Sequence, residues 1–83
     1  MKNPPIKLQH LQALGFTIGA KEDLDQGDYY IDATLYKNDS RIDHTIEFRA
    51  NGDYITSYTE FNLETLKGRK IKIKDIQLLI EIM

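Results

Sequence analysis

Between residues 28 and 61, apolar and polar residues alternate, and two short turn sequences interrupt the alternation. Asn51-Gly52 is the stronger turn signal, because both residues tolerate the positive φ angles of a two-residue type I′ hairpin turn. Asn38-Asp39 is taken as the preceding turn. This pattern predicts an antiparallel meander of three strands, at residues 28–37, 41–50 and 53–61.

The two predicted hairpins agree on which face of the meander is apolar. A two-residue loop at 51–52 sets Ile42 opposite Phe61, and a loop at 38–39 sets the same Ile42 opposite Leu35. A slip of one residue in either hairpin would turn every side chain to the other face, so the register is strongly specified. The same register sets Arg49 opposite Tyr54, in one row with Asp28, and sets Asp43 opposite Glu60. Because those two carboxylates repel each other, we expect that end of the sheet to fray, to twist or to bind a cation.

A helix is predicted on each side of the meander. Pro4-Pro5 precedes apolar residues at helical spacing over 6–14, and Gly15 is suited to end that helix. Asp75 can cap a second helix over 76–83. Residues 16–20 and 70–74 alternate like short strands, and 21–27 reads as a polar loop. We expect a single α+β domain over 1–83, with four to five antiparallel strands and both helices on one sheet face.

The size and composition of the chain limit its stability and indicate its cellular location. A domain of 83 residues buries only a modest core, and without cysteine it has neither a disulfide nor a thiolate metal site. Oligomerisation is the remaining common way to stabilise so small a fold, so we expect a homodimer. No apolar run reaches the roughly 20 residues that span a bilayer, and no signal sequence is recognisable. We therefore expect a cytoplasmic protein without membrane contact.

Charge is distributed unevenly along the chain. Residues 22–64 carry eleven acidic and three basic residues, whereas five basic residues gather near the end. This basic segment consists of Lys67, Arg69, Lys70, Lys72 and Lys74. Its lysines alternate with Ile71 and Ile73, which favours an amphipathic strand that protects a sheet edge or pairs with the acidic middle of the chain. Nucleic-acid binding through the segment is an alternative, although no aromatic residue follows Leu63 to stack on bases.

Catalytic signatures are weak in this sequence. His10 and His44 have no second metal ligand at a recognised spacing, and the glycines match no phosphate or dinucleotide motif. Asp32, Glu47 and Arg49 resemble the Asp…Glu-x-Lys metal site of restriction-type nucleases, but arginine replaces the lysine and cannot give up a proton. We therefore predict no enzyme activity, no cofactor and no metal site, and keep a metal-dependent nuclease as a remote alternative.

Two sets of residues are predicted to contact partners. Tyrosine among threonine and charged residues suits a binding face, because the ring supplies contact area while the hydroxyl stays hydrated. The predicted binding residues are Tyr30, Tyr36, Tyr54, Tyr58 and Arg49. The last helix is apolar on more sides than one sheet contact explains, so its surplus apolar residues are candidates for self-association. These residues are Ile76, Leu78, Leu79 and Ile82.

The pattern of the whole chain resembles short uncharacterised proteins of phages and mobile elements. The likeness lies in the helix that ends on Leu11-Gln-Ala-Leu-Gly-Phe16, in the tyrosine-bearing meander, and in the last helix reading Asp75-Ile-Gln-Leu-Leu79. The resemblance implies an α+β fold and a bacterial or phage origin, and it brings no catalytic residues. The predicted function is a non-catalytic, self-associating module that binds an unknown protein. The alternatives are nucleic-acid binding through 67–74 and inhibition of a host defence protein through an acidic face.

Overall fold

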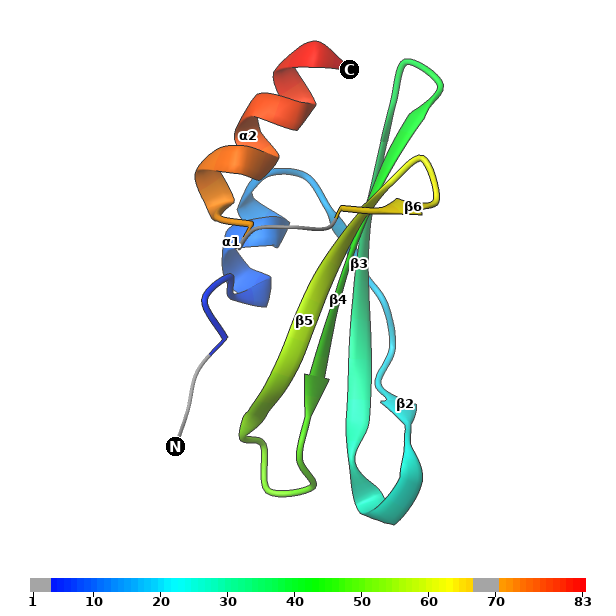
Figure 1. Cartoon of the computed structure of the whole chain (residues 1–83), viewed down its shortest axis with the longest axis vertical. Helices are drawn as coiled ribbons and strands as arrows, with labels where there is room; N and C mark the ends of the chain where they lie inside the picture. Colours follow the sequence, from blue (N-terminus) through cyan, green and yellow to red (C-terminus); the bar gives the residue numbers. More distant parts are fainter. Residues whose placement is uncertain (1–3, 67–70) are drawn as a thin grey trace.

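The computed structural model describes residues 4–66 and 71–83, which form an α+β fold with a short helix at each end of a six-stranded antiparallel sheet (Figure 1). The elements follow one another in this order: α1 (Leu8–Ala13), β1 (Thr17–Ile18), β2 (Glu22–Asp23), a 3-10 turn (Asp25–Gly27), β3 (Tyr29–Lys37), β4 (Ser40–Phe48), β5 (Tyr54–Phe61), β6 (Glu64–Thr65) and α2 (Ile73–Ile82).

The pairing of β3 with β4 has the predicted register. Leu35 lies opposite Ile42 and Tyr29 lies opposite Phe48. The connecting turn is a two-residue loop in which Asn38 and Asp39 have φ angles of 49° and 65°. Both values are positive, as a type I′ turn requires. The predicted register of this hairpin is confirmed.

The hairpin between β4 and β5 has the predicted register except near its turn. Ile42 lies opposite Phe61 as expected. The prediction of a type I′ turn at Asn51-Gly52 is wrong, since only Gly52 has a positive φ and its N–H donates to the Arg49 carbonyl at 2.8 Å. This is a three-residue loop with glycine in the left-handed position. Arg49 therefore lies opposite Asp53 rather than Tyr54, and its N–H donates to the Asp53 carbonyl at 2.7 Å.

A β-bulge compensates for the longer loop. Glu47 pairs with Thr56, but the next residue, Phe48, pairs with Tyr54, which leaves Ile55 as an extra residue on β5. Directly opposite residues share a face of the sheet, so Tyr54 lies on the same face as Phe48. The predicted position of Tyr54 on the polar face is therefore wrong.

Short strands complete the sheet and raise its strand count above the predicted four to five. β1 and β2 both pair with β3, at Thr17 opposite Thr34 and at Glu22 opposite Tyr30. β6 pairs with the end of β5. Each of these strands has two residues, so β1 is shorter than the strand expected at 16–20, and β2 lies in the predicted loop.

Both helices lie on one side of the sheet in Figure 1, and the core lies between them and β3 and β4. The buried cluster draws residues from both helices, from two strands and from the segments that flank α1: Ile6, Leu11, Phe16, Ala33, Ile42 and Ile76. Gly15 ends α1 with a φ of 100°, and the Phe16 N–H donates to the Leu11 carbonyl at 3.1 Å. None of the described helices has the length and apolar character needed to cross a bilayer.

Helix α2 begins earlier than predicted. Lys72 is the N-cap, and Asp75 sits three residues inside, where its Oδ2 accepts a hydrogen bond from the Lys72 N–H at 2.8 Å. The strand predicted at 70–74 is not found in its described part, because Ile73 and Lys74 form the first turn of the helix. At the other end, Lys37 Nζ donates to the Ile80 carbonyl and Asn38 Nδ2 donates to the Met83 carbonyl, both at 3.0 Å.

The turn between β5 and β6 contains a leucine in an unfavourable backbone conformation. Asn62 and Leu63 have φ angles of 50° and 69°, which is again the type I′ pattern, and Leu63 is 68% exposed. Replacing Leu63 with glycine should raise the free energy of unfolding by about 0.5 to 1 kcal/mol, because glycine adopts this φ without a clash at Cβ. Equilibrium urea unfolding measures the change.

The matched control is Asn51→Gly in the turn between β4 and β5. Asn51 is not among the residues with positive φ, and its Oδ1 accepts a hydrogen bond from the Asp53 N–H at 3.0 Å. Glycine should therefore lower stability there, by about 0.5 to 1 kcal/mol. Stabilisation by Asn51→Gly, or destabilisation by Leu63→Gly, would contradict the assigned turn types.

Candidate functional site

One face of the β3–β4–β5 meander is covered by neither described helix, and we call it the open face (Figure 1). Its residues alternate with those that point toward the helices, and they lie opposite one another across the strands. They are Tyr30, Asp32, Thr34 and Tyr36 on β3, Arg41, Asp43, Thr45 and Glu47 on β4, and Thr56, Tyr58 and Glu60 on β5.

Polar contacts fix two carboxylates of the open face, those of Asp32 and Asp43. The Thr45 hydroxyl donates to Asp32 Oδ1 at 2.5 Å, and the Thr34 hydroxyl donates to Asp43 Oδ1 at 2.8 Å. Arg41 Nε lies 2.7 Å from Asp43 Oδ2 and forms an ion pair with it. Hydrogen bonding to Asp43 raises the pKa of Arg41 above its ordinary value, so the guanidinium stays charged.

This ion pair accounts for the two acidic residues that face each other at the end of the sheet. Asp43 lies opposite Glu60, as predicted, yet its side chain is buried. Arg41 lies two residues before Asp43 on the same strand, so both side chains project from the same face. The cation expected at this position is therefore supplied by the chain itself.

Three of the four predicted binding tyrosines lie on the open face. Tyr36 is 70% exposed and Tyr58 is 40% exposed, while Tyr30 is half-buried. The Arg41 guanidinium lies over the Tyr36 ring, 5.4 Å from its centroid, in a cation–π contact. These side chains bring aromatic area and charge together on one surface.

The other two predicted binding residues lie apart from this surface. Tyr54 is on the opposite face, where its hydroxyl is 3.2 Å from the Ser57 hydroxyl. Arg49 is at the edge of the turn, where its Nη1 lies 3.5 Å from Asp28 Oδ2. Of the predicted row, Asp28 and Arg49 form an ion pair, but Tyr54 is not next to them on that face.

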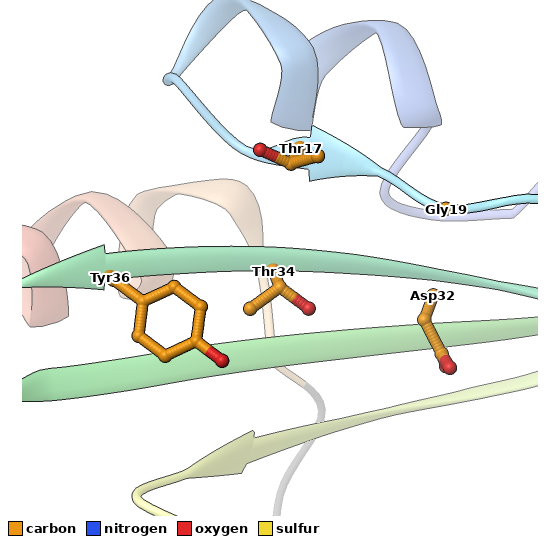
Figure 2. A pocket seen from close by; sticks show the side chains of 5 residues that line it. All are labelled: Thr17, Gly19, Asp32, Thr34 and Tyr36. Atoms are coloured by element: carbon orange, nitrogen blue, oxygen red, sulfur yellow. The ribbon is translucent and has the colours of Figure 1, made fainter.

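A shallow groove of about 300 Å³ lies along the open face between β1 and β3 (Figure 2). It is lined by Thr17, Gly19, Asp32, Thr34 and Tyr36. The Gly19 N–H donates to the Asp32 carbonyl at 2.7 Å, and a Cβ at position 19 would come within 3.1 Å of that oxygen. Glycine thus lets the chain between β1 and β2 run close beside β3 and form one wall of the groove.

The open face carries more negative than positive charge. Its charged residues are Asp32, Asp43, Glu47, Glu60 and Arg41, and Arg41 is paired with Asp43. Within residues 4–66 and 71–83, Asp32, Glu47 and Glu60 have no ion-pair partner, since the ion pairs found there are Arg41–Asp43 and Arg49–Asp28. Three negative charges on this surface are therefore not neutralised by the described part of the chain.

The structure brings together only two of the three residues that suggested a nuclease. Asp32 and Glu47 share the open face, but Arg49 pairs with Asp28 near the turn. In the described parts of the chain, no group of three His, Asp or Glu side chains is placed to hold a metal ion. Of these residues, Asp32 accepts a hydrogen bond from the Thr45 hydroxyl.

The basic segment is described only in part. Lys67, Arg69 and Lys70 lie outside the described residues, while Lys72 and Lys74 are exposed at the start of α2. That helix lies on the other side of the sheet from the open face (Figure 1). Lys72 and Lys74 form no ion pair with the open-face carboxylates in the described structure.

The residues predicted for self-association divide into two groups. Ile76 is completely buried, and Leu79 packs partly buried against the core. Leu78 and Ile82 are 52% and 75% exposed, and they lie one turn apart on α2. Of the four predicted residues, only Leu78 and Ile82 form an exposed apolar surface.

His44 is buried on the helix-covered face, while His10 is exposed on α1. His44 Nδ1 lies 2.8 Å from the Thr59 hydroxyl, and Nε2 has no hydrogen-bond partner among the described residues. Burial disfavours the charged imidazolium and lowers the pKa of His44 to about 4. A neutral histidine enclosed in this way is a packing residue.

Comparisons of the chain with protein-family models, with curated proteins and with solved structures find no significant match.

Burial of His44 predicts that stability falls on acidification. Between pH 6.5 and 4 the unfolded chain binds a proton on His44 that the folded chain does not bind, so the free energy of unfolding decreases as the pH falls through this range. The loss attributable to His44 should reach about 3 kcal/mol. Urea unfolding at a series of pH values measures it.

A His44→Gln variant provides the comparison, because glutamine can bond the Thr59 hydroxyl but does not titrate. Its stability should depend less on pH between 6.5 and 4 than that of the wild type. Carboxylates contribute equally to both proteins, so the difference isolates His44. Identical pH dependence in the two proteins would show that the burial of His44 does not affect its titration.

Proposed function

We propose that this protein is a non-catalytic interaction module that binds a partner protein through its open face. The observation that carries the proposal is the grouping of Tyr30, Tyr36 and Tyr58 with fixed carboxylates on a surface that no described helix covers. Tyrosine and arginine are, with tryptophan, the residues most enriched among the hot spots at the centres of protein interfaces. The open face has both, with Tyr36 and Arg41 in contact.

The charge of the open face favours a partner with a basic surface. Asp32, Glu47 and Glu60 are not paired within the described chain, so a partner that carries lysine or arginine would gain complementary contacts. Nucleic acid would be repelled by the same carboxylates. Binding of nucleic acid through 67–74 remains the alternative, and it would use a different side of the molecule from the one proposed here.

A basic partner surface is also what nucleic-acid-binding proteins present. The finer form of the proposal is that the open face competes with phosphate for such a surface, as an inhibitor of a host defence protein would. A cytoplasmic protein of phage or mobile-element origin suits that role. Asp32 supports it, because the Thr45 hydroxyl holds its carboxylate in place, and a fixed charge binds with a smaller loss of side-chain entropy.

The proposal is tested by capture from a lysate of the source organism. The protein is immobilised as wild type, as the double variant Tyr36→Ala/Tyr58→Ala, and as Tyr54→Ala, and the retained proteins are quantified by mass spectrometry. The amount of partner captured by the double variant should be at least about tenfold lower than that captured by the wild type, which is the size of effect expected at interface hot spots. Tyr54→Ala should retain the partner, because Tyr54 lies on the opposite face.

Circular dichroism first confirms that each variant is folded. If wild type and the double variant capture the same proteins in the same amounts, the open face is not the binding surface. Loss of capture in Tyr54→Ala alone would move the site to the other face of the sheet.

We further propose that the chain self-associates through α2. Leu78 and Ile82 are the support for this, because they form an exposed apolar pair on a helix whose Ile76 is already buried. In sedimentation equilibrium, the wild type should show a concentration-dependent rise in mass, and Leu78→Ser/Ile82→Ser should remain a monomer. Leu24→Ser, which changes an exposed leucine far from α2 in the sequence, is the control. A monomeric wild type at high concentration would overturn the proposal.

A further inference from the structure

The groove between β1 and β3 has the features of a receptor for one basic side chain. We infer that it takes the lysine or arginine head group of a partner protein, with the charge beside Asp32 and the aliphatic stem along Thr34 and Tyr36. This inference rests on the proposed function of the open face and adds the position at which a cation binds.

Asp32 supplies the negative charge of the groove. Its Oδ1 accepts a hydrogen bond from the Thr45 hydroxyl, which holds the carboxylate in one orientation. Its second oxygen has no partner within residues 4–66 and 71–83, and Figure 2 shows the side chain at one end of the labelled residues. A carboxylate held by one oxygen and open at the other is suited to a charge-assisted hydrogen bond with an ammonium or guanidinium group.

The remaining walls suit the rest of a long basic side chain. Tyr36 lies at the other end of the groove and is 70% exposed, and its ring already holds the Arg41 guanidinium in a cation–π contact at 5.4 Å. Thr17 and Thr34 lie opposite each other between the two ends, where their methyl groups can pack against methylene groups. The groove is therefore acidic at one end and aromatic at the other.

The surrounding charges distinguish a cation from the other ligands that hydroxyl-lined grooves bind. Among the described residues, Arg41 is the only basic residue of the open face, and it already forms an ion pair with Asp43. An anion at Asp32 would find no unpaired cation among the described residues of that face, and a neutral sugar would gain nothing from the net negative charge. A basic side chain would pair its charge with the Asp32 carboxylate and pack its methylene groups along Thr34 and the Tyr36 ring.

Chemical-shift mapping of the ¹⁵N-labelled protein tests the inference with two defined peptides. One is acetyl-Gly-Arg-Gly-amide, and the other has citrulline in place of arginine, which keeps the shape and removes the charge. The arginine peptide should shift the amide signals of Thr17, Gly19 and Asp32 in a saturable manner. The citrulline peptide should bind about tenfold more weakly or not at all.

Two variants decide whether Asp32 is responsible. Asp32→Asn can still accept the hydrogen bond from Thr45, so it should stay folded and bind the arginine peptide about tenfold more weakly. Glu64→Gln removes an exposed carboxylate on β6, outside the groove, and should bind as the wild type does. Equal shifts with the two peptides, no shifts at the groove, or unchanged binding by Asp32→Asn would each overturn the inference.

Failure of this inference is distinguishable from failure of the proposed function. If the peptides do not bind at the groove while Tyr36→Ala/Tyr58→Ala still loses its captured protein, the open face binds its partner without a basic side chain in the groove. If the double variant captures normally while the arginine peptide binds beside Asp32, the groove binds cations and the wider face is not the interface.

Discussion

The pairing of β3 with β4 is the contact on which the rest of this structure depends. It sets Ala33 and Ile42 toward the helices and sets Asp32, Asp43 and Thr45 on the other face. Since side chains alternate strictly along a strand, one register decides both the composition of the core and the composition of the open face. The register that buries the apolar cluster therefore also determines which carboxylates and tyrosines lie together on the open face. The core and the candidate binding surface are two results of one alignment.

The sequence was sufficient to predict this alignment, because Asn38-Asp39 and the alternation around it agree, and Tyr29 to Leu35 match Phe48 to Ile42 as expected. The extra residue at Ile55 was not predictable in the same way, since a two-residue and a three-residue loop at Asn51-Gly52 give the same pattern beyond the bulge. Leu63 gave no turn signal, because leucine seldom adopts positive φ. Residues 70–74 alternate like a strand, but the capping contact of Asp75 with Lys72 allows the helix to begin at Ile73.

The candidate site was predictable to a similar extent. Tyr30, Tyr36 and Tyr58 were assigned to the correct face by alternation, whereas Tyr54 was misplaced by the single unpaired residue before Thr56. The Arg41–Asp43 pair follows from the i, i+2 spacing, which places both side chains on one face, and it could have been read from the sequence. The groove could not, because it needs β1 to lie beside β3, and a two-residue strand has too short a pattern to reveal its partner.

The turn at Asn38-Asp39 also contacts the end of α2. Lys37 and Asn38 donate hydrogen bonds to the carbonyls of Ile80 and Met83, so side chains of one hairpin satisfy acceptors that the helix itself leaves without donors. Opening the tip of the β3–β4 hairpin would therefore also release the last turn of the helix. Local opening in this region is expected to involve both elements at once, so that amide protons of the hairpin tip and of the helix end exchange with solvent as one cooperative unit.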